Sequence, residues 1–575
     1  MASQVQRKRT IGALWRRAVA DERPFPAYLV ETDAGWKEVS WEEAGRRVDE
    51  LANGLLALGI GKGDSVAIIG PTRIEWALLD FALALVGAVG APVYADTTAD
   101  DCAYAIELVE AVAVFVDESQ RETLETAIRG NSRVRHVIGF DELDDLAARG
   151  REHGREHPEA LREAESAVSE DDLFTYIYTS GTTGPPKACM ILHRNYFAMA
   201  DSVHRIDEFT IAEDVMLLYL PLAHNFGRLL HLLGAYEGYT LALLTDPLRT
   251  AEVLPDVKPT VLPSVPRLYE KVHARIQGQF DEARGLRRRL IDWALRVGYE
   301  ASPYKQRGQP LPRGLALQHR VADRLVYSKV KERLGGRLRI AVSGGAPLAT
   351  EIAEFFHALD ILILEGYGLS ECTTASSVNR IGRVKFGTVG PALPGFELKT
   401  AEDGEVLIRS QTIFAGYKGD EEATRRVLDA DGWLRSGDIG ELDEEGFLRI
   451  TDRKKDIIVT ASGKNVAPQN LENALKSGEL ISQALVIGDR RPYVTALITL
   501  DAEQADGLSE AEARAKVQEI VDGVNQGRSR FEQIKKFAVL PRDFSAERNE
   551  VTPTLKLRRR VCEEHFAAEI DALYR

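Results

Sequence analysis

Residues 176–187, with the sequence YIYTSGTTGPPK, combine glycines, hydroxyl side chains and a lysine in one short loop. Glycines let the backbone approach a ligand and direct several N–H groups toward one point. Together with the hydroxyl groups and the Lys187 ammonium, these donors suit a polyphosphate. The common P-loop is excluded, because Lys187 follows two prolines and precedes Ala188 rather than serine or threonine. A flexible linker is the alternative, but the apolar run before the loop argues against it.

Buried strands and helices alternate on both sides of this loop. Residues 65–70 and 111–116 have the apolar pattern of buried strands. Residues 46–58, before the first strand, and 74–86, between the two, have helical patterns. Strands that alternate with helices predict a mostly parallel sheet. Because further strand candidates follow residue 210, we expect an α/β fold whose large N-terminal domain contains two doubly wound layers.

Later in the chain the pattern becomes antiparallel. Two pairs of alternating apolar and polar runs flank turns at 403–404 and 445–446, which predicts two hairpins in a small β-rich part. A third hairpin pattern further on is flanked by helical stretches. We therefore predict a large N-terminal domain over 1–452 and a small α+β domain over 453–575.

The composition is typical of a soluble protein with several domains: 575 residues, 44% hydrophobic and 28% charged. Lysine and arginine total 73 against 88 acidic residues, so the formal net charge is −15. This balance argues against a nucleic-acid partner, which needs a broadly basic surface. Four cysteines without metal-ligand or disulfide spacing indicate a reducing compartment, and the N-terminus lacks a secretory signal pattern. We expect a cytoplasmic protein.

Two segments bear on membrane contact. The longest apolar stretch, residues 76–95, is interrupted by Asp80 and Pro92, so we interpret it as a buried helix followed by a buried strand. Residues 284–337 instead hold 14 lysines and arginines against 4 acidic residues. They could form a surface for anionic lipid or for the phosphates of a nucleotide-like substrate. The more frequent alternative is a solvated helix face whose basic residues pair with acidic neighbours.

The loop at 176–187 resembles the signature of the adenylate-forming superfamily, which comprises acyl-CoA synthetases, peptide-synthetase adenylation domains and luciferases. Further motifs resemble that family in the same order over nearly the whole chain: SGGAPL at 343–348, ILEGYGLSE at 363–371, DGWLRSGDIG at 431–440 and TPTLK at 552–556.

The resemblance implies that the domain over 1–452 binds AMP and an acyl group and that the domain over 453–575 is mobile. It also implies an ATP site. By analogy with the family, Tyr367 stacks on adenine, Asp438 accepts hydrogen bonds from the ribose, and Arg453 contacts ribose and phosphate. Lys556 reaches the substrate carboxylate and the α-phosphate. The ATP and AMP ligands implied in this way are Thr179, Ser180, Gly181, Thr182, Thr183, Gly184, Lys187, Gly345, Ala346, Tyr367, Gly368, Ser370, Asp438, Arg453 and Lys556.

The same resemblance implies a metal and a catalytic set. Glu371 and Thr179 are the expected Mg²⁺ ligands, since Mg²⁺ takes hard oxygen ligands and bridges phosphates. Lys556, His224, Glu371 and Lys187 are the expected catalytic residues. Without the motifs, Glu371 would be interpreted as a surface carboxylate, Lys556 as a solvated charge and His224 as a core histidine.

A hinge and a CoA site are implied near the start of the C-terminal domain. Lys455 stands where the family has its hinge residue, often an aspartate. The following ASGKNVAP resembles the loop that faces the CoA tunnel after the domain rotates, which implies CoA contacts by Ser462, Gly463 and Lys464.

Residues 220–234, LPLAHNFGRLLHLLG, resemble the long-chain fatty acyl-CoA synthetases. The resemblance implies that His224 lies near the acyl carboxylate and that Phe226 and Arg228 lie at the mouth of an acyl tunnel. We expect an ATP-dependent long-chain fatty acid–CoA ligase that uses ATP, Mg²⁺ and CoA. A medium-chain or aryl substrate, an enzyme that stops at the adenylate, and a non-catalytic binding protein are the alternatives. The resemblance leaves open a homodimer.

Overall fold

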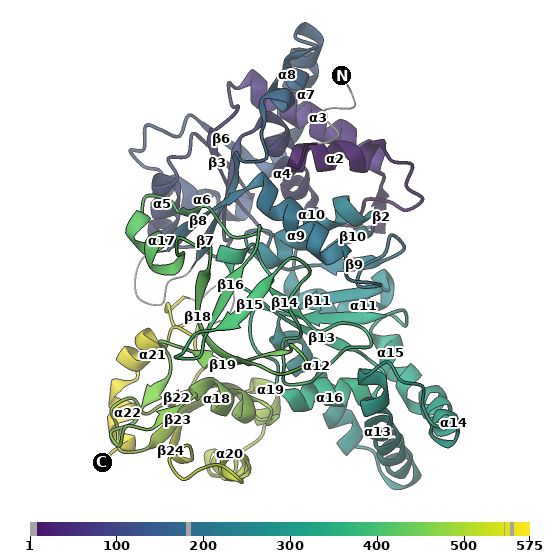
Figure 1. Cartoon of the computed structure of the whole chain (residues 1–575), viewed down its shortest axis with the longest axis vertical. Coiled ribbons are helices and arrows are strands. Elements are labelled where there is room, and N and C mark those ends of the chain that lie inside the picture. The colour runs from purple at the N-terminus through teal and green to yellow at the C-terminus, as the bar shows by residue number, and fades with distance from the viewer. Residues whose placement is uncertain (1–7, 180–185, 546, 552–556) are drawn as a thin grey trace.

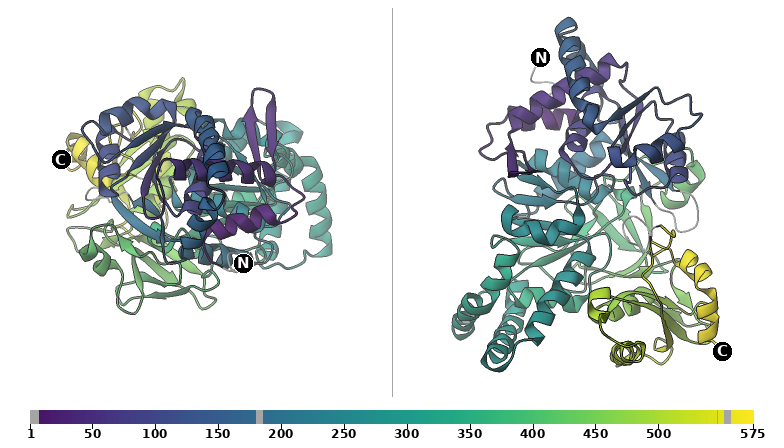
Figure 2. Two further views of the ribbon diagram at one scale, coloured as in Figure 1. Left: turned by 90° about the horizontal axis from the view of Figure 1, so that it is seen from above. Right: turned by 180° about the vertical axis from the view of Figure 1, so that it is seen from behind.

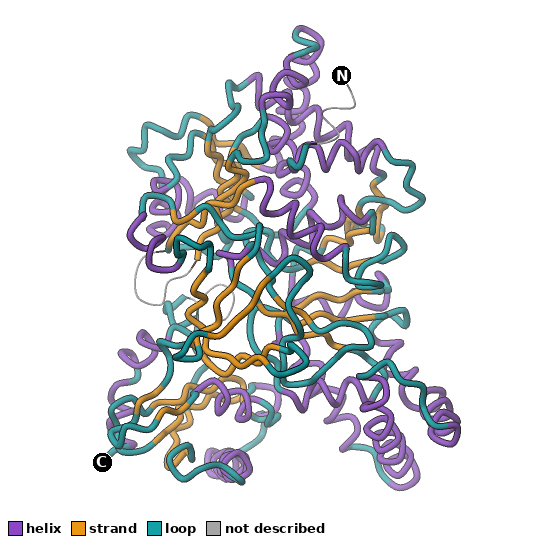
Figure 3. Tube along the Cα trace, viewed as in Figure 1, coloured by secondary structure: helices purple, strands orange, loops and turns teal. Residues whose placement is uncertain are grey.

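The computed structural model describes residues 8–179, 186–545, 547–551 and 557–575. A large N-terminal part fills most of Figure 1, and a smaller C-terminal part, in light green and yellow, lies at its lower left. The view from behind in Figure 2 shows the same two parts, and Figure 3 shows strands in the middle of the molecule with helices above, below and to the right of them. This is the α/β architecture expected from the sequence.

The largest sheet has eight strands in the order β14-β13-β12-β11-β9-β10-β1-β2. Its interior pairs are parallel, whereas the edge strands β14 and β2 are antiparallel to their neighbours. Its strands are β1 (Tyr28–Thr32), β2 (Gly35–Val39), β9 (Val215–Leu218), β10 (Thr240–Leu243), β11 (Val261–Ser264), β12 (Ile340–Ser343), β13 (Ile363–Tyr367) and β14 (Ser377–Val378).

The second large sheet has seven strands in the order β17-β8-β7-β4-β3-β5-β6. The strands from β7 to β6 pair in parallel, and β8 and β17 continue the sheet as antiparallel strands. Its strands are β3 (Ser65–Ile69), β4 (Val89–Val93), β5 (Ala113–Val116), β6 (His136–Gly139), β7 (Leu173–Thr179), β8 (Lys187–Leu192) and β17 (Gly416–Tyr417). The two mostly parallel sheets confirm the predicted doubly wound layers.

The predicted hairpins form a four-stranded antiparallel sheet in the order β15-β16-β18-β19. Their turns lie at 403–404 and 445–446, where Gly404 and Gly446 adopt the positive φ that such turns favour. The strands are β15 (Glu397–Thr400), β16 (Glu405–Arg409), β18 (Leu434–Leu442) and β19 (Leu448–Arg453).

The C-terminal part is built on β22 (Ile481–Ile487), β23 (Val494–Leu500) and β24 (Ile534–Val539). The first two strands form the third predicted hairpin, and β24 lies parallel to β23. The remaining elements are β20 (Ile458–Val459), β21 (Asn465–Val466), α18 (Pro468–Lys476), α19 (Ala502–Ala505), α20 (Glu510–Asn525), α21 (Arg559–His565) and α22 (Ala567–Leu573).

Helices of the N-terminal part cover the two large sheets. One continuous apolar core joins residues of both sheets with those of the central helices, and Figure 1 shows α9 and α10 between them. The helices are α2 (Ile11–Ala20), α3 (Trp41–Ala57), α4 (Ile74–Val86), α5 (Ala99–Leu108), α6 (Arg121–Ala127), α7 (Leu143–Glu156), α8 (Ala160–Ala167), α9 (His193–His204), α10 (Asn225–Glu237), α11 (Thr250–Val257), α12 (Pro266–Asp281), α13 (Gly285–Gln306), α14 (Arg313–Ala322), α15 (Ser328–Arg333), α16 (Thr350–Ala358) and α17 (Glu421–Val427).

The stretch 76–95 and the helix predicted over 46–58 both appear in the structure, the second with a different start. The stretch 76–95 is indeed a buried helix, α4, followed by the buried strand β4. No helix within the described ranges has the length and apolarity needed to cross a membrane. The helix predicted over 46–58 begins earlier, at Trp41, because the Ser40 hydroxyl caps it by accepting the backbone N–H of Glu43 at 3.1 Å.

Candidate active site

A cavity of about 1580 Å³ opens between the eight-stranded sheet, the four-stranded sheet and the start of the C-terminal part. Lys187, Glu371, Asp438 and Arg453, which lie far apart in the sequence, all line it. Further predicted nucleotide ligands on its wall are Thr179, Gly345, Ala346, Tyr367, Gly368 and Ser370. The structure therefore places these charged and polar residues around one space.

The remaining predicted nucleotide ligands lie outside the described residues: Ser180, Gly181, Thr182, Thr183, Gly184 and Lys556. Their described neighbours Thr179, Lys187 and Leu557 line the cavity. The roles assigned to the six residues stay predictions.

Asp438 is held between an aromatic hydroxyl and a guanidinium group. It stands opposite Arg453 in the β18–β19 pair, and its Oδ1 lies 3.4 Å from Arg453 Nε. The Tyr367 hydroxyl donates to Asp438 Oδ2 at 2.6 Å. Burial, reinforced by the charge of Asp438, raises the pKa of Tyr367, so this hydroxyl keeps its proton and donates. A buried carboxylate fixed in this way presents acceptors to a neutral donor such as a hydroxyl pair.

Tyr417, which the sequence analysis missed, links Glu371 to Lys187. Its hydroxyl donates to Glu371 Oε1 at 2.6 Å, and the Lys187 ammonium lies 4.9 Å from its ring centre. Pairing of β17 with β8 puts Tyr417 opposite Cys189, close to the strand that begins at Lys187. Lys187 Nζ also lies 3.2 Å from Asp420 Oδ2. An anionic ligand would compete with Asp420 for this ammonium.

The donor set fits a magnesium ion that takes most of its ligands from a substrate. Glu371 would supply one carboxylate, and Thr179 at the end of β7 would supply a hydroxyl on the same cavity wall. The described residues contain no cluster of three or more His, Cys, Asp or Glu that could hold a metal alone. Mg²⁺ usually keeps several waters and binds one or two carboxylates plus phosphates, so one carboxylate beside a phosphate site is sufficient.

Gly368 makes the turn after β13 that positions the residues that follow. A Cβ at Gly368 would lie 2.0 Å from the carbonyl oxygen of Thr374, too close for any other residue. Gly345 adopts a φ of +83°, which glycine tolerates best. Both glycines line the cavity, as Tyr367 does.

His224 caps the N-terminus of α10 and faces the cavity. Its Nδ1 accepts the backbone N–H of Phe226 at 3.1 Å, which fixes the orientation of the imidazole. Phe226 lines the same cavity. The roles of these two residues toward an acyl group stay predictions, but both lie where such roles are feasible.

The expectation that Arg228 lies at the mouth of a tunnel is wrong. Arg228 is fully buried, forms an ion pair with Asp80 in which its Nε lies 3.0 Å from Oδ2, and also donates to the Thr175 hydroxyl. The physical reason is the helical period. At about 100° per residue, Arg228 lies about 200° from Phe226 on α10 and so faces the sheet on the opposite side.

An apolar region of the cavity was not predicted residue by residue. It is contributed by α9, α10, β9, β11 and the loop after α9. The helical signal was present, because Phe226, Leu229, Leu230 and Leu233 share one face of α10. The apolar lining comprises Val203, Ile206, Phe209, Met216, Phe226, Leu229, Leu230, Leu233 and Val261.

Glu365 on β13 is a buried carboxyl group that the sequence analysis also missed. It lines the cavity, and its Oε2 accepts the backbone N–H of Leu348 at 3.3 Å. Its Oε1 has no hydrogen-bond partner among the described residues. Burial raises the pKa of Glu365 to about 7, because a charge there would be poorly solvated.

The residues of the predicted hinge and CoA site lie in different surroundings. Lys455 lines the cavity, whereas Ser462, Gly463 and Lys464 are not part of its wall. A hydrogen bond near Lys455 connects the two parts: Asp452 Oδ2 accepts the backbone N–H of Gln469, at the start of α18, at 3.2 Å. The CoA assignment stays a prediction.

The cavity thus combines charged groups that suit a nucleotide with an apolar region that suits a second substrate. Residues 15–418 match the AMP-binding enzyme family, and residues 455–575 match the AMP-binding enzyme C-terminal domain. The chain therefore belongs to the AMP-binding enzyme family, within the adenylate-forming superfamily that the loop motif indicated.

Individual relatives extend over nearly the whole chain. The long-chain-fatty-acid–CoA ligase FadD15 of Mycobacterium bovis is 37% identical over 96% of this chain and 95% of that protein. The adenylation domain of a carboxylate reductase from Mycobacterium chelonae has a TM-score of 0.77 at 23% identity, over 98% of this chain and 91% of that one. ATP-bound MatB from Rhodopseudomonas palustris has a TM-score of 0.71 at 24% identity, over 97% and 99%. The two solved structures share the fold.

Proposed function

We propose that the chain is an ATP-dependent long-chain fatty acid–CoA ligase that forms AMP. The observation that carries this proposal is a single cavity in which Lys187, Glu371, Asp438 and Arg453 stand together with an apolar lining. The charged residues suit a nucleotide triphosphate, and the apolar lining suits an alkyl chain. The similarity to FadD15 of Mycobacterium bovis, named as a long-chain-fatty-acid–CoA ligase, supports the same substrate class.

In the first half-reaction, a carboxylate oxygen attacks the α-phosphorus of ATP, and the bond from that phosphorus to the pyrophosphate oxygen breaks. The products are acyl-adenylate and pyrophosphate. Lys187 and Lys556 are proposed to face the charge that develops on the phosphate oxygens, because fixed cations stabilise such transition states strongly. Asp438 and Arg453 hold the ribose, and Tyr417 keeps the Glu371 carboxylate oriented. Bound Mg²⁺ would supply additional positive charge to the phosphates.

In the second half-reaction, the CoA thiol attacks the acyl carbonyl carbon. The bond to the adenylate oxygen breaks, so the thioester and AMP are released and the thiol proton leaves to solvent or a base. We propose that the C-terminal part rotates about Lys455, removing Lys556 and bringing Ser462, Gly463 and Lys464 toward the acyl group. A rotation explains why one carbonyl can serve two reactions that need different neighbours.

A chain-length series tests the proposal. Pyrophosphate release is measured with palmitate, a medium-chain acid, acetate and benzoate, each with ATP and with or without CoA. Palmitate should give the highest kcat/KM, and CoA should be required for release of AMP and formation of the thioester. A preference for the medium-chain acid or benzoate would support the alternative substrate class, and AMP release without thioester formation would contradict the ligase assignment.

A further inference from the structure

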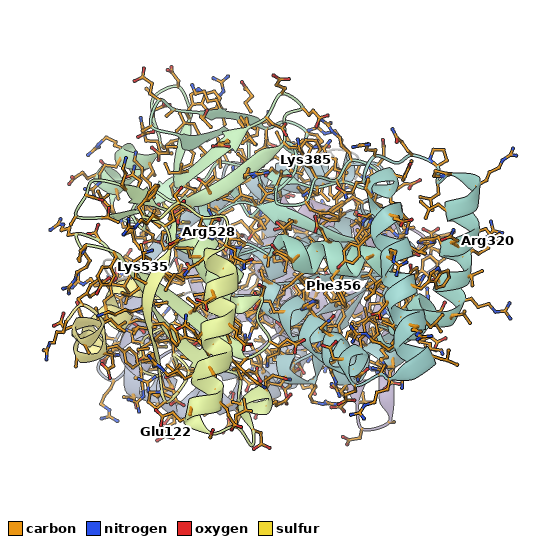
Figure 4. All side chains as sticks on the ribbon, turned by 90° about the horizontal axis from the view of Figure 1, so that it is seen from below. Glu122, Arg320, Phe356, Lys385, Arg528 and Lys535 are labelled. Atoms are coloured by element: carbon orange, nitrogen blue, oxygen red, sulfur yellow. The ribbon has the colours of Figure 1, made fainter. Side chains whose placement is uncertain are left out.

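The helix α14 and the following π-helical turn η4 (Asp323–Tyr327) form an outer edge of the molecule. Figure 1 shows α13 and α14 projecting from the large part at the lower right, away from the C-terminal part. Figure 4 places Arg320 of α14 at the periphery, seen from below. An element that projects in this way can meet a flat surface without hindrance from the body of the protein.

One face of this element packs inward. Leu315 packs against the main core, Ala322 and Val326 are buried, and His319 is mostly covered. Their spacing of three to four residues is that of a single helix face. This inward face therefore holds α14 against the body of the protein.

The outward face carries a second apolar row, which stays partly exposed. Leu317, Val321 and Leu325 are spaced four residues apart and are 61%, 43% and 41% exposed. Single exposed apolar residues are ordinary, but three in register on one helix face form a stripe. Such an exposed apolar stripe is typical of a surface that binds a partner.

A row of arginines runs beside this stripe. At about 100° per residue, Arg313, Arg320 and Arg324 fall within about 40° of one another and next to the apolar row. All three are exposed, and within the described ranges none of their side chains forms an ion pair or hydrogen bond. Their charge is thus available to an external anion.

The rest of the basic segment behaves differently. Arg288 pairs with Asp281 and Asp292, while Lys305 and Lys331 both pair with Asp360. For those residues the frequent alternative, a helix face neutralised by acidic neighbours, is correct. Arg313, Arg320 and Arg324 differ from these residues, because they are exposed and have no such acidic partner within the described ranges.

We propose that the outward face of α14 and η4 docks on a membrane that contains anionic lipid. This α14 surface consists of Arg313, Leu317, Arg320, Val321, Arg324 and Leu325. The arginines would contact lipid phosphates, and the aliphatic row would enter the headgroup boundary, as on an amphipathic helix lying in the interface. The surface is positively charged although the whole chain has a net charge of −15, so the attraction is local.

A lipid surface fits these observations better than other anionic partners. A nucleic acid would use the arginines but would leave the aliphatic row in water. An acidic protein would need a complementary apolar patch, and the vesicle experiment distinguishes it from a lipid surface. The proposal is independent of the ligase function, because docking is measured without substrates.

Sedimentation with vesicles tests the proposal. Full-length protein is mixed with vesicles of phosphatidylcholine, with or without phosphatidylglycerol, at low and high salt. The protein should bind the anionic vesicles at low salt only. R313E/R320E/R324E should lower the partition coefficient at least about 100-fold, since each basic residue near an anionic surface contributes roughly fivefold. L317S/V321S/L325S should lower it roughly tenfold.

Matched variants separate the surface from overall charge and folding. R129E/R149E/R155E changes the net charge equally at exposed positions outside the basic segment and should bind as the wild type does. R313K/R320K/R324K keeps the charge and should also bind. Ligase activity with dissolved substrate should stay within twofold in every variant. The proposal would be overturned if the two glutamate triple variants bound equally or if the protein bound neutral vesicles. It would also be overturned if the protein bound no vesicles but captured an acidic protein.

Discussion

Several buried charged groups in this protein have their protonation or pairing set by their surroundings. Asp80 and Arg228 are both fully buried, and burial and Arg228 lower the pKa of the adjacent His231 to about 3, so that His231 is neutral. A buried ion pair of this kind costs desolvation energy but becomes strongly destabilising when one partner is removed, by about 3–5 kcal/mol. Arg228 therefore anchors α10, whose N-cap is His224, to the neighbouring helix α4.

The raised pKa of Glu365 predicts how the stability of the protein depends on pH. Its pKa is raised from 4.5 to about 7. Between these values the unfolded state loses the proton while the native state keeps it, so this group makes stability fall as pH rises through the window. Glu365→Gln should therefore gain stability relative to wild type between pH 5 and pH 8, by up to about 3 kcal/mol. Thermal or urea unfolding at both pH values measures the difference.

The exposed Glu300→Gln provides the control for Glu365→Gln and should leave the pH dependence of unfolding unchanged. If Glu365→Gln unfolds with the same pH dependence as the wild type, the raised pKa is refuted.

Close backbone contacts position the helices around the sheets. Gly298 lies in α13, where a Cβ would meet the carbonyl oxygen of Ala358, at the end of α16, at 1.9 Å. The carbonyl belongs to backbone and cannot rotate away, so any side chain would separate the two helices. This contact fixes the base of the projection that carries α14.

Gly298→Ala should destabilise the protein by about 1–3 kcal/mol through overpacking. Gly523→Ala in α20 is the matched control, because a Cβ there meets nothing within 4 Å. It should be neutral or stabilising by up to about 1 kcal/mol, since alanine favours a helix. Unfolding of both variants by urea provides the comparison, and equal losses would contradict the role of the close contact.

Contacts between the two parts of the molecule hold the C-terminal part over the cavity. Arg267 Nη1 donates to the carbonyl oxygen of Ser482 at 2.9 Å, and Nη2 lies 3.0 Å from the Ser482 hydroxyl. Leu557 lines the cavity from the C-terminal part. Polar contacts of this kind are typical of transient interfaces, which suits the rotation proposed about Lys455.

Lys556→Ala should slow adenylate formation by about 10²–10³-fold, by analogy with the removal of one transition-state donor. It should spare thioester formation from preformed acyl-adenylate, because the lysine is proposed to leave before that step. Pyrophosphate release and acyl transfer are measured separately. Lys535→Ala, an exposed lysine of the C-terminal part outside the cavity wall, should affect neither step. Equal losses in both half-reactions for Lys556→Ala would contradict the assignment.

Local pattern was enough to predict the hairpins at 403–404 and 445–446 and the buried pair α4 and β4. These depend on turn residues and on apolar periodicity between near neighbours. Other features depended on partners distant in sequence. Tyr417 reaches Glu371 only because β17 pairs with β8, and Arg228 is buried only because it meets Asp80.

The sequence by itself determined the alternation of strands and helices, the family motifs and the types of residue available for phosphate chemistry. The tertiary structure alone decided which of them share a cavity, which face of α10 meets it, and which arginines of the basic segment keep an unpaired charge. The physical reason is that motifs and periodicity act over a few residues. Burial and charge pairing, in contrast, depend on the order of strands in a sheet, and residues hundreds of positions apart in the chain then become neighbours.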